Sequence, residues 1–261
     1  LSFQDFRPLL FGRRKGQAVT PISSGRKSWK ERVSLYVRGN FFVPDPRVWW
    51  VRPTAAYLRK YLREHPVDVI VTTGPPQSMH LIGQRLAGAT GIPWIPDFRD
   101  PWTKMYYLKH LPLTGRTWRR LEKMEQSVID DASAVLTVTP LVQEIYASKT
   151  STPVHMITNG FDEEDFDFEA SPDGFFNVTH TGLFAKDGNP EELWKVLGDI
   201  SSSDAAFKEK LRLRLAGKTD PEVLEAISAA GLSGNVVDLG YCRHADAVRE
   251  QKSATVLILP L

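Results

Sequence analysis

The sequence predicts an α/β protein made of two doubly wound parallel-sheet domains. Short β-branched apolar runs alternate with helix-like stretches between residues 67 and 259, an order that is typical of βαβ units with right-handed crossovers. An Asn159-Gly160 pair lies where the first strand–helix series ends, and Asn-Gly favours positive φ and a tight backbone reversal. We therefore predict two domains that face a cleft and are joined by a crossover at residues 159–175.

Composition limits the class of protein. Of the 261 residues, 42% are hydrophobic and 25% are charged, as in a soluble globular protein with a substantial core. No run approaches the roughly 18 apolar residues that a membrane-spanning helix needs, and the first residues do not form a signal peptide. Cys242 is the single cysteine, which excludes a disulfide framework and a cysteine-based zinc site. A reducing, cytoplasmic setting is the default expectation.

Charge is divided unevenly along the chain. Residues 1–65 hold 14 Lys and Arg against 4 Asp and Glu, whereas residues 66–261 hold 19 against 27. A basic segment on an acidic body favours an anionic partner. We expect a membrane surface and no nucleic acid, with a solvated basic loop as the alternative. Aromatic residues in this segment suit a lipid interface, although we expect most of them to be core or a flap over a binding site. They are Trp29, Phe41, Phe42, Trp49 and Trp50.

Residues 1–65 form the basic, aromatic start of the first domain. The first 28 residues or so have loop compositions. Ser28, with Glu31 three residues later, then matches a capping box. Apolar residues recur at helical spacing after it and predict a buried stripe: Trp29, Val33, Tyr36 and Val37. A second helix is predicted over residues 53–64.

The first regular domain is predicted over residues 66–158. Strands are expected at 67–72, 92–96, 134–139 and 154–157. Helices are expected at 79–90, 116–131 and 140–149. The β-branched run at 67–72 is typical of a strand that is buried on both faces of a parallel sheet.

The second domain is predicted over residues 176–261 and repeats this order. Strands are expected at 177–181, 211–216, 236–239 and 255–259, and helices at 190–200, 220–230 and 244–252. Asn189 would cap the first of these helices, with Pro190 as its first residue. The chain stops at Leu261 directly after a buried-looking strand, and residues 1–65 lack a clear initial strand and glycine loop. We therefore expect both domains to be incomplete, as in a fragment truncated at both ends.

Five short motifs occur in order and at suitable distances along the chain. They are Asp97-Phe-Arg-Asp-Pro-Trp102, Thr158-Asn-Gly-Phe-Asp162, His180-Thr-Gly-Leu-Phe184, Leu215-Ala-Gly217 and Leu239-Gly-Tyr241. Together they resemble a GT-B-fold glycosyltransferase, close to glycosyltransferase family 4 (glycosyl transferases group 1) of bacterial polysaccharide and glycolipid synthesis. The resemblance covers roughly residues 66–261. It implies two Rossmann-like domains, with a nucleotide sugar bound to the C-terminal domain and an acceptor to the N-terminal one.

The resemblance also implies an activity. A sugar would pass from a nucleotide-diphosphate sugar to a glycan or lipid-linked acceptor with retention at the anomeric carbon. The expected location is the cytoplasm, with the inner face of the cell membrane as the alternative. The nucleotide sugar is a substrate, and neither a cofactor nor an essential metal is expected. The family's donor-binding pair of Glu residues would follow Leu261, so we expect this polypeptide alone to be inactive or nearly so.

Residues predicted to bind the donor lie in the loops after strands, where backbone N–H groups can meet a diphosphate. They are Asn159, Gly160, Gly182, Lys186, Gly217, Lys218, Gly240 and Tyr241. Tyr241 would stack on a base and Lys218 would approach a phosphate. The family often has Arg after the first glycine and a later Lys-Gly, whereas this chain has Leu183 and Asp187-Gly188. Lys186 is therefore as readily a solvated lysine as a ligand.

Asp97, Arg99 and Asp100 are the catalytic candidates, since they follow a strand whose carboxyl end would face the cleft. Asp100 would orient or deprotonate an acceptor hydroxyl, beside the Arg99 guanidinium. Relatives often carry His-Asp where this chain has Arg99-Asp100, so a histidine's role does not transfer. A capping Asp-Pro with a structural salt bridge is the alternative.

Gly74, Ser78 and His80 are predicted on the acceptor side, because they lie in and after the preceding strand-end loop. Two other classes of function stay open. One is a nucleotide-sugar epimerase of the same architecture, and the other is a non-catalytic module that binds carbohydrate or a membrane surface. A dehydrogenase is disfavoured, since no GxGxxG follows a strand with an acidic residue about twenty positions later.

Overall fold

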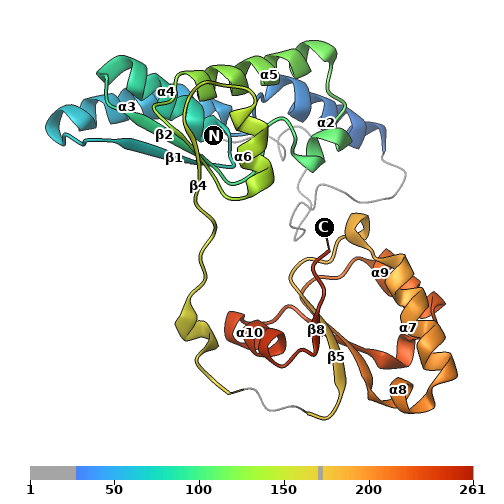
Figure 1. Cartoon of the computed structure of the whole chain (residues 1–261). Coiled ribbons are helices and arrows are strands. Elements are labelled where there is room, and N and C mark those ends of the chain that lie inside the picture. The colour runs from blue at the N-terminus through green and yellow to red at the C-terminus, as the bar shows by residue number, and fades with distance from the viewer. Residues whose placement is uncertain (1–27, 170–172, 261) are drawn as a thin grey trace. The chain divides into compact units, whose positions relative to one another are not determined.

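Two α/β units make up the chain. The computed structural model describes residues 28–169 and 173–260. Unit 1 comprises Leu1–Asn159 and unit 2 comprises Gly160–Leu261. Each unit is built on a four-stranded parallel sheet with helices packed against it (Figure 1). The predicted α/β class with two parallel-sheet domains is confirmed, while the loop composition predicted for residues 1–27 lies outside the described residues.

The sheet of unit 1 runs in sequence order. Its strands are β1 (Ile70–Gly74), β2 (Trp94–Phe98), β3 (Val135–Thr137) and β4 (Val154–Met156). Because right-handed crossovers between strands in this order keep to one face, helices α5 and α6 share a single core cluster with β2. On the other face, the Val71 side chain is 58% exposed. The prediction that this strand is buried on both faces is therefore wrong for the described residues.

The helices of unit 1 follow the predicted pattern closely. They are α2 (Trp29–Phe41), η1 (Val48–Trp50), α3 (Val51–Glu64), α4 (Ser78–Thr90), η2 (Tyr106–His110), α5 (Gly115–Asp130) and α6 (Pro140–Ala147). The capping box at the start of α2 is confirmed: the Glu31 N–H donates to Ser28 Oγ at 3.3 Å, and the Ser28 N–H donates to Glu31 Oε2 at 2.9 Å. Helix α4 ends at Gly91, whose φ of 73° is the left-handed conformation that glycine adopts freely.

The aromatic residues between Trp29 and β1 lie mainly at the surface. Side chains predicted to be core are exposed, with Trp29 at 71% and Trp49 at 62%. The apolar stripe predicted for α2 is wrong as a buried face, because Gly39 is the only buried residue of that helix. Gly39 packs against Leu111 and Leu113, whereas the Val33 and Tyr36 side chains are exposed. In the described part of the chain, every helix is too short or too polar to span a bilayer.

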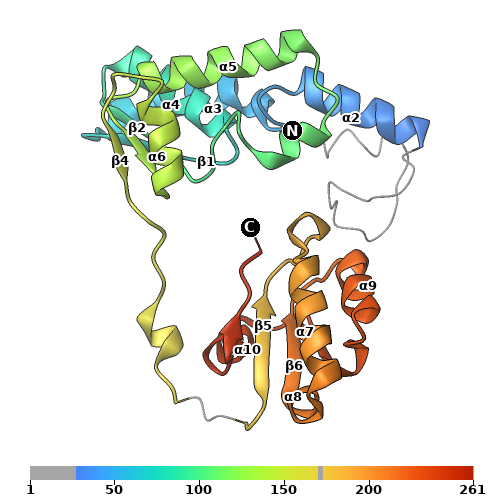
Figure 2. The same ribbon diagram turned by 45° about the vertical axis from the view of Figure 1, so that its right-hand side comes forward.

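The sheet of unit 2 has a reversal in its strand order. The strands are β5 (Phe176–Thr181), β6 (Leu211–Ala216), β7 (Val236–Gly240) and β8 (Val256–Leu257), in the spatial order β7-β6-β5-β8. The chain moves outward from β5 to β7 and then returns to the other side of β5. Right-handed crossovers therefore place helices on both faces. Figures 1 and 2 show α10 (His244–Lys252) on the opposite side of β5 from α7 (Glu191–Ser203).

The remaining helices of unit 2 include one that the sequence did not reveal. Helix α8 (Ala205–Lys210) was not predicted; Asp204 caps it by accepting from two backbone N–H groups. Helix α9 (Pro221–Ala229) lies within the predicted range of 220–230, and Asp220 caps it. The predicted cap of α7 is wrong, because Pro190 occupies the cap position and the Asn189 side chain instead accepts from Trp194 Nε1 at 2.7 Å.

The Asn159-Gly160 pair does not form the predicted reversal. Gly160 is not among the glycines with positive φ, and residues 157–162 carry no regular structure. The turn η3 (Glu163–Phe166) follows, capped by Asp162. It is fastened within unit 2: His244 Nε2 lies 2.7 Å from Asp165 Oδ2, and Lys252 Nζ donates to the carbonyls of Phe166 and Phe168. The steric preference of Asn-Gly for a turn is only a tendency, and here the chain stays extended.

Candidate functional site

Polar side chains gather at the carboxyl ends of β1 and β2 in unit 1. Thr73 Oγ1 donates to Asp97 Oδ2 at 2.8 Å, and Arg99 Nε lies 3.3 Å from the same oxygen. The Arg99 guanidinium also donates to the side-chain oxygen of Asn159. The structure therefore brings together a predicted catalytic pair and a predicted donor-binding residue. Thr73 was missed, although its position one residue before the end of a strand could have suggested it.

Asp100 differs from Asp97 in its surroundings. Its side chain is exposed, and its carboxylate accepts no hydrogen bond among the described residues. Asp97, in contrast, accepts a hydrogen bond from Thr73 and forms an ion pair with Arg99. This ion pair is the structural salt bridge that the sequence left open as an alternative. Asp100 is therefore the carboxylate at this edge that remains open to a ligand.

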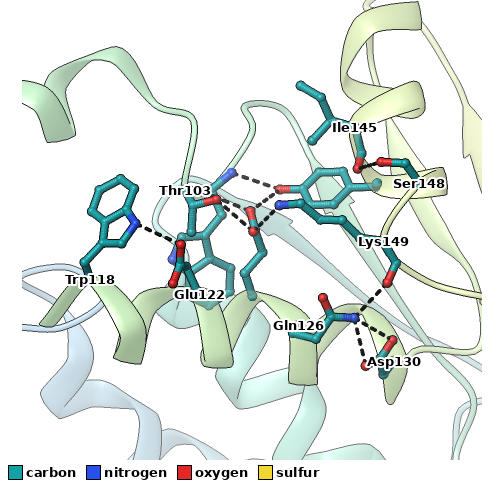
Figure 3. Close-up of polar contacts among 11 residues, drawn as sticks. Thr103, Trp118, Glu122, Gln126, Asp130, Ile145, Ser148 and Lys149 are labelled. Atoms are coloured by element: carbon teal, nitrogen blue, oxygen red, sulfur yellow. Dashed lines mark hydrogen bonds and ion pairs between the residues drawn. The ribbon is translucent and has the colours of Figure 1, made fainter. Parts of the chain in front are cut away.

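A buried carboxylate anchors the loop that carries these residues. Glu125 of α5 accepts from the Thr103 N–H at 3.0 Å and from Thr103 Oγ1 at 2.8 Å. Lys149 Nζ lies 2.6 Å from Glu125 Oε2, and Tyr146 donates to Oε1 at 3.3 Å (Figure 3). The Tyr146 hydroxyl in turn accepts from the Trp102 N–H at 2.9 Å. Burial, and then the Glu125 charge, raise the pKa of Tyr146, so its hydroxyl stays protonated and available as a donor.

The predicted acceptor-side residues are folded inward. Ser78 is buried, and both its N–H and its hydroxyl donate to the buried carboxylate of Asp45, at 2.7 and 3.0 Å. Gly74 is also buried, and a Cβ there would lie 2.5 Å from His80 Nε2. The side chains that actually face solvent at this loop belong to Thr73 and Pro75. The acceptor-side role of these residues stays a prediction, and in this structure none of them offers an exposed side chain.

His80 forms part of the core beneath that loop. Its ring is fully buried, packs at a tilt against Phe98 with ring centroids 4.4 Å apart, and pairs with Thr72 Oγ1 through Nδ1 at 3.0 Å. Trp94 Nε1 donates to the same hydroxyl at 2.9 Å. His80 Nε2 has no hydrogen-bond partner among the described residues. Burial lowers the pKa of His80 to about 3, so the ring is neutral at physiological pH.

Three glycines meet at the carboxyl edge of the unit 2 sheet. Gly182, Gly217 and Gly240 follow β5, β6 and end β7, and all three have positive φ. The Gly182 N–H donates to the Ala216 carbonyl at 2.8 Å, and the Gly217 N–H donates to the Gly240 carbonyl at 2.7 Å. A Cβ on Gly217 would lie 2.0 Å from the Gly182 oxygen. Glycine is therefore required for these loops to pack together.

This edge is also where the strand order reverses. From β5 the chain first moves to β6 and β7 on one side, and it later returns to β8 on the other side of β5. Open α/β sheets bind ligands at such a switch point, beyond the carboxyl ends of the strands. The N–H groups of Leu183 and Lys218 make no backbone hydrogen bond among the described residues. These two residues directly follow Gly182 and Gly217, and their backbone N–H groups can donate hydrogen bonds to a ligand.

The charged and aromatic residues predicted to bind the donor substrate differ in whether their side chains already have a partner within the unit. Lys186 Nζ lies 3.5 Å from Glu222 Oε1, so its charge is partly matched within the unit. The Lys218 side chain is exposed and has no ion pair in the described ranges. Tyr241 is 97% exposed. Lys218 and Tyr241 are therefore the better placed of the predicted donor residues, and Gly160 lies in the extended segment before η3.

Metal-ligating residues do not cluster in the described ranges. No group of three or more His, Cys, Asp or Glu side chains there is placed to hold an ion. The residues that the sequence missed, Asp45 and Glu125, are both buried carboxylates that accept several hydrogen bonds. Asp45 lies between two prolines, which is a turn signal, whereas nothing local in the sequence marks Glu125.

Comparisons with known proteins agree with this architecture. A sequence model of the family described as Glycosyltransferase Family 4 matches residues 13–165. Sucrose-phosphate synthase from Thermosynechococcus elongatus is similar in structure, with a TM-score of 0.57 and 15% identity over 81% of this chain and 54% of its own. The α,α-trehalose 6-phosphate synthase from Burkholderia multivorans has a TM-score of 0.54 and 11% identity over 90% and 57% of the two chains.

A third solved structure is that of S. aureus TarM in complex with fondaparinux, α-GlcNAc-glycerol and UDP. It has a TM-score of 0.50 and 11% identity over 78% of this chain and 39% of its own. The chain thus spans about half the length, or less, of these similar structures. At such identities the likeness shows the GT-B fold alone. No curated protein matches the chain by sequence. The family match, which covers more than half of the sequence, shows that the chain belongs to glycosyltransferase family 4.

Proposed function

We propose that this chain serves the transfer of a sugar from a nucleotide-diphosphate sugar to a glycan or lipid-linked acceptor. The observation that carries the proposal is the edge of unit 2 where Gly182, Gly217 and Gly240 converge at the switch point of the sheet. Family membership supports a transferase, and the UDP in the TarM complex makes a nucleoside diphosphate a reasonable donor product. A role in bacterial surface polysaccharide synthesis, with retention, extends the same proposal.

Unit 2 offers three kinds of contact to a nucleoside diphosphate. The Leu183 and Lys218 N–H groups and the Lys218 ammonium would meet the phosphates, and Tyr241 would stack on the base. The missing Arg after Gly182 is offset by Lys218, since Lys186 already pairs with Glu222. The protein would then stabilise the charge that builds up on the leaving diphosphate.

Nucleotide binding tests this proposal directly. UDP, GDP or ADP should raise the melting temperature of the chain, and the corresponding nucleosides should raise it less, because the diphosphate makes most of the charged contacts. Replacing Lys218 or Tyr241 by alanine should each weaken binding about tenfold, equivalent to roughly 1.4 kcal/mol. The matched control is Tyr57→Ala, which removes a similarly exposed tyrosine from unit 1. A panel in which no nucleoside diphosphate shifts the melting temperature would contradict the proposal.

At the edge of unit 1, Asp100 would act on the acceptor hydroxyl. In the full-length protein, Asp100→Asn should lower kcat by a factor of about 10² to 10⁴, the usual range for a positioned acid or base. The substrate KM should change little. Asp68→Asn, which neutralises another exposed aspartate of unit 1, should leave the rate unchanged. Equal sugar-transfer rates for the Asp100 variant and the wild type would rule out this role.

An anionic membrane surface is proposed as a further partner of residues 1–65. Exposed aromatic side chains and cations alternate in the described part of this segment, as where the Arg47 guanidinium lies 5.6 Å from the ring centroid of Trp50. Such a mixture suits the headgroup region, since rings bury in it while cations meet phosphates. Failure to sediment with phosphatidylglycerol vesicles at low salt would count against this partner.

A further inference from the structure

Helices α4 and α5 of unit 1 enclose an open groove of about 770 Å³. The described residues that line this α4/α5 groove all belong to these two helices. Its size is within the usual range for a small-molecule site. None of the residues discussed above as catalytic, donor-binding or acceptor-side candidates lines it.

Among the described residues, every ionisable side chain that lines the groove is a cation. Arg85 belongs to α4, and the others belong to α5: Arg116, Arg119, Arg120 and Lys123. The α5 members stand at positions i, i+3, i+4 and i+7, so they form one continuous stripe along a helix face. No carboxylate of the part of the chain that the structure describes lines the groove.

These five cations have no internal partner in the part of the chain that the structure describes. None of their side chains makes an ion pair or a hydrogen bond there. Nearby carboxylates are engaged elsewhere: Glu122 accepts from Trp118 Nε1 at 2.9 Å, and Asp131 accepts from Gln84 Nε2 at 2.7 Å (Figure 3 shows the first pair). The positive charge of the groove is therefore left for a ligand.

Helix stability does not explain this stripe. The first turn of α5 holds no acidic residue, and Arg116, its second residue, opposes the positive end of the helix dipole. Like charges at i, i+3 and i, i+4 repel one another as well. An anion in the groove would reverse both effects, since it would neutralise the stripe next to the helix N-terminus.

The groove is held in shape by polar contacts at its base. Gln84 of α4 donates to Ser127 Oγ of α5 at 2.6 Å and so ties the two helices together. Leu81 and Met124 add an apolar part to the lining. A preformed groove loses little ordering entropy on binding. Its chemistry suits a ligand with several phosphates and some apolar surface, because guanidinium groups bind phosphate bidentately.

We propose that the α4/α5 groove is a second ligand site, which binds a molecule carrying at least two phosphate groups. The proposal is independent of the glycosyl-transfer proposal, since the groove shares no residue with either candidate edge. The same phosphate chemistry is present in a free polyphosphate and in the headgroups of a membrane surface. The two sources are separated by experiment.

Titration of the full chain with tripolyphosphate, followed by calorimetry, tests the free form. Binding should be detected, and Arg119→Glu combined with Arg120→Glu should weaken it by about tenfold or more, since two charge-assisted contacts are lost. Sedimentation with phosphatidylcholine vesicles, with and without phosphatidylglycerol, tests the headgroup form. If the chain binds tripolyphosphate but does not sediment with vesicles, the ligand is a free polyphosphate. If the chain sediments with anionic vesicles and the double variant does not, the ligand is a lipid headgroup. Either result supports the site.

The matched control is Lys104→Glu combined with Lys109→Glu. It changes the net charge by the same amount on exposed residues of the same unit, outside the groove. Tripolyphosphate affinity should be retained in this control. Equal losses in both double variants would show general electrostatic attraction and overturn the site, as would the absence of both tripolyphosphate binding and vesicle sedimentation. Circular dichroism of both variants confirms that they fold.

Discussion

Replacing Glu125 by alanine is expected to lower the free energy of unfolding of unit 1 by about 3–5 kcal/mol, the usual result of breaking a buried charge network. The change leaves the Thr103 N–H, the Thr103 hydroxyl and the Tyr146 hydroxyl without their acceptor in a buried site. Each such donor costs roughly 1–3 kcal/mol when it stays unpaired. Urea denaturation followed by far-ultraviolet circular dichroism measures the loss.

The same substitution should loosen the loop after β2. Trp102 and Thr103 are held by Tyr146 and Glu125, and they follow directly on the segment that carries Asp97 and Asp100. Amide hydrogen exchange over residues 99–105 should therefore speed up, by more than in the sheet itself. Glu125 acts through Thr103 and not on a substrate, so it is a positioning residue.

Glu122→Gln is the control for Glu125. It lies three residues earlier on the same helix, is exposed, and accepts from Trp118 alone among the described residues. The side-chain oxygen of the glutamine can still accept from Trp118. The free energy of unfolding should therefore change by no more than about 0.5 kcal/mol, as is usual for surface substitutions. A Glu125→Ala variant no less stable than this control would show that the network contributes nothing net.

Sequence patterns predicted the elements well because those elements are set by local rules. Helix α10 has the expected bounds, and strand β6 does too, since apolar spacing and post-strand glycine mark them. Strand β1 begins three residues later and ends two residues later than the predicted strand at 67–72. The apolar run begins before the residues that pair with β2, so its start does not mark the start of the strand. Helix α8 was missed because it is short and follows α7 after a single residue.

The site was harder to predict because its contacts join distant parts of the chain. Asp45 reaches Ser78 across 33 positions, and Arg99 reaches Asn159 across 60. The post-strand glycines were found from local chemistry, but their mutual packing depends on the strand order. His80 was expected near a substrate because it begins a helix after a strand-end loop. Its burial follows from the aromatic core around Phe98, which no local pattern reveals.

Gly217→Ala is expected to destabilise unit 2 by at least about 3 kcal/mol, at the severe end of single substitutions. Its φ of 136° is rarely adopted by residues with a side chain, and the new Cβ would lie 2.0 Å from the backbone oxygen of Gly182. A backbone atom cannot turn away as a side chain does, so β5 or β6 must shift. Hydrogen exchange of the β5 and β6 amides reports the loss within unit 2, separately from unit 1.

Gly231→Ala separates strain from collision. Gly231 also has positive φ, at 76°, but a Cβ there would meet nothing within 4 Å, so its substitution should cost only about 1–2 kcal/mol. The additional loss of stability in Gly217→Ala, compared with Gly231→Ala, measures the cost of separating the loops that follow β5 and β6. Because those loops form the proposed diphosphate site, Gly217→Ala should also abolish the nucleotide-dependent rise in melting temperature, whereas Gly231→Ala should retain it. Equal effects of the two substitutions would mean that the Gly182 carbonyl moves aside freely, and the close approach of the loops would then not be what shapes the site.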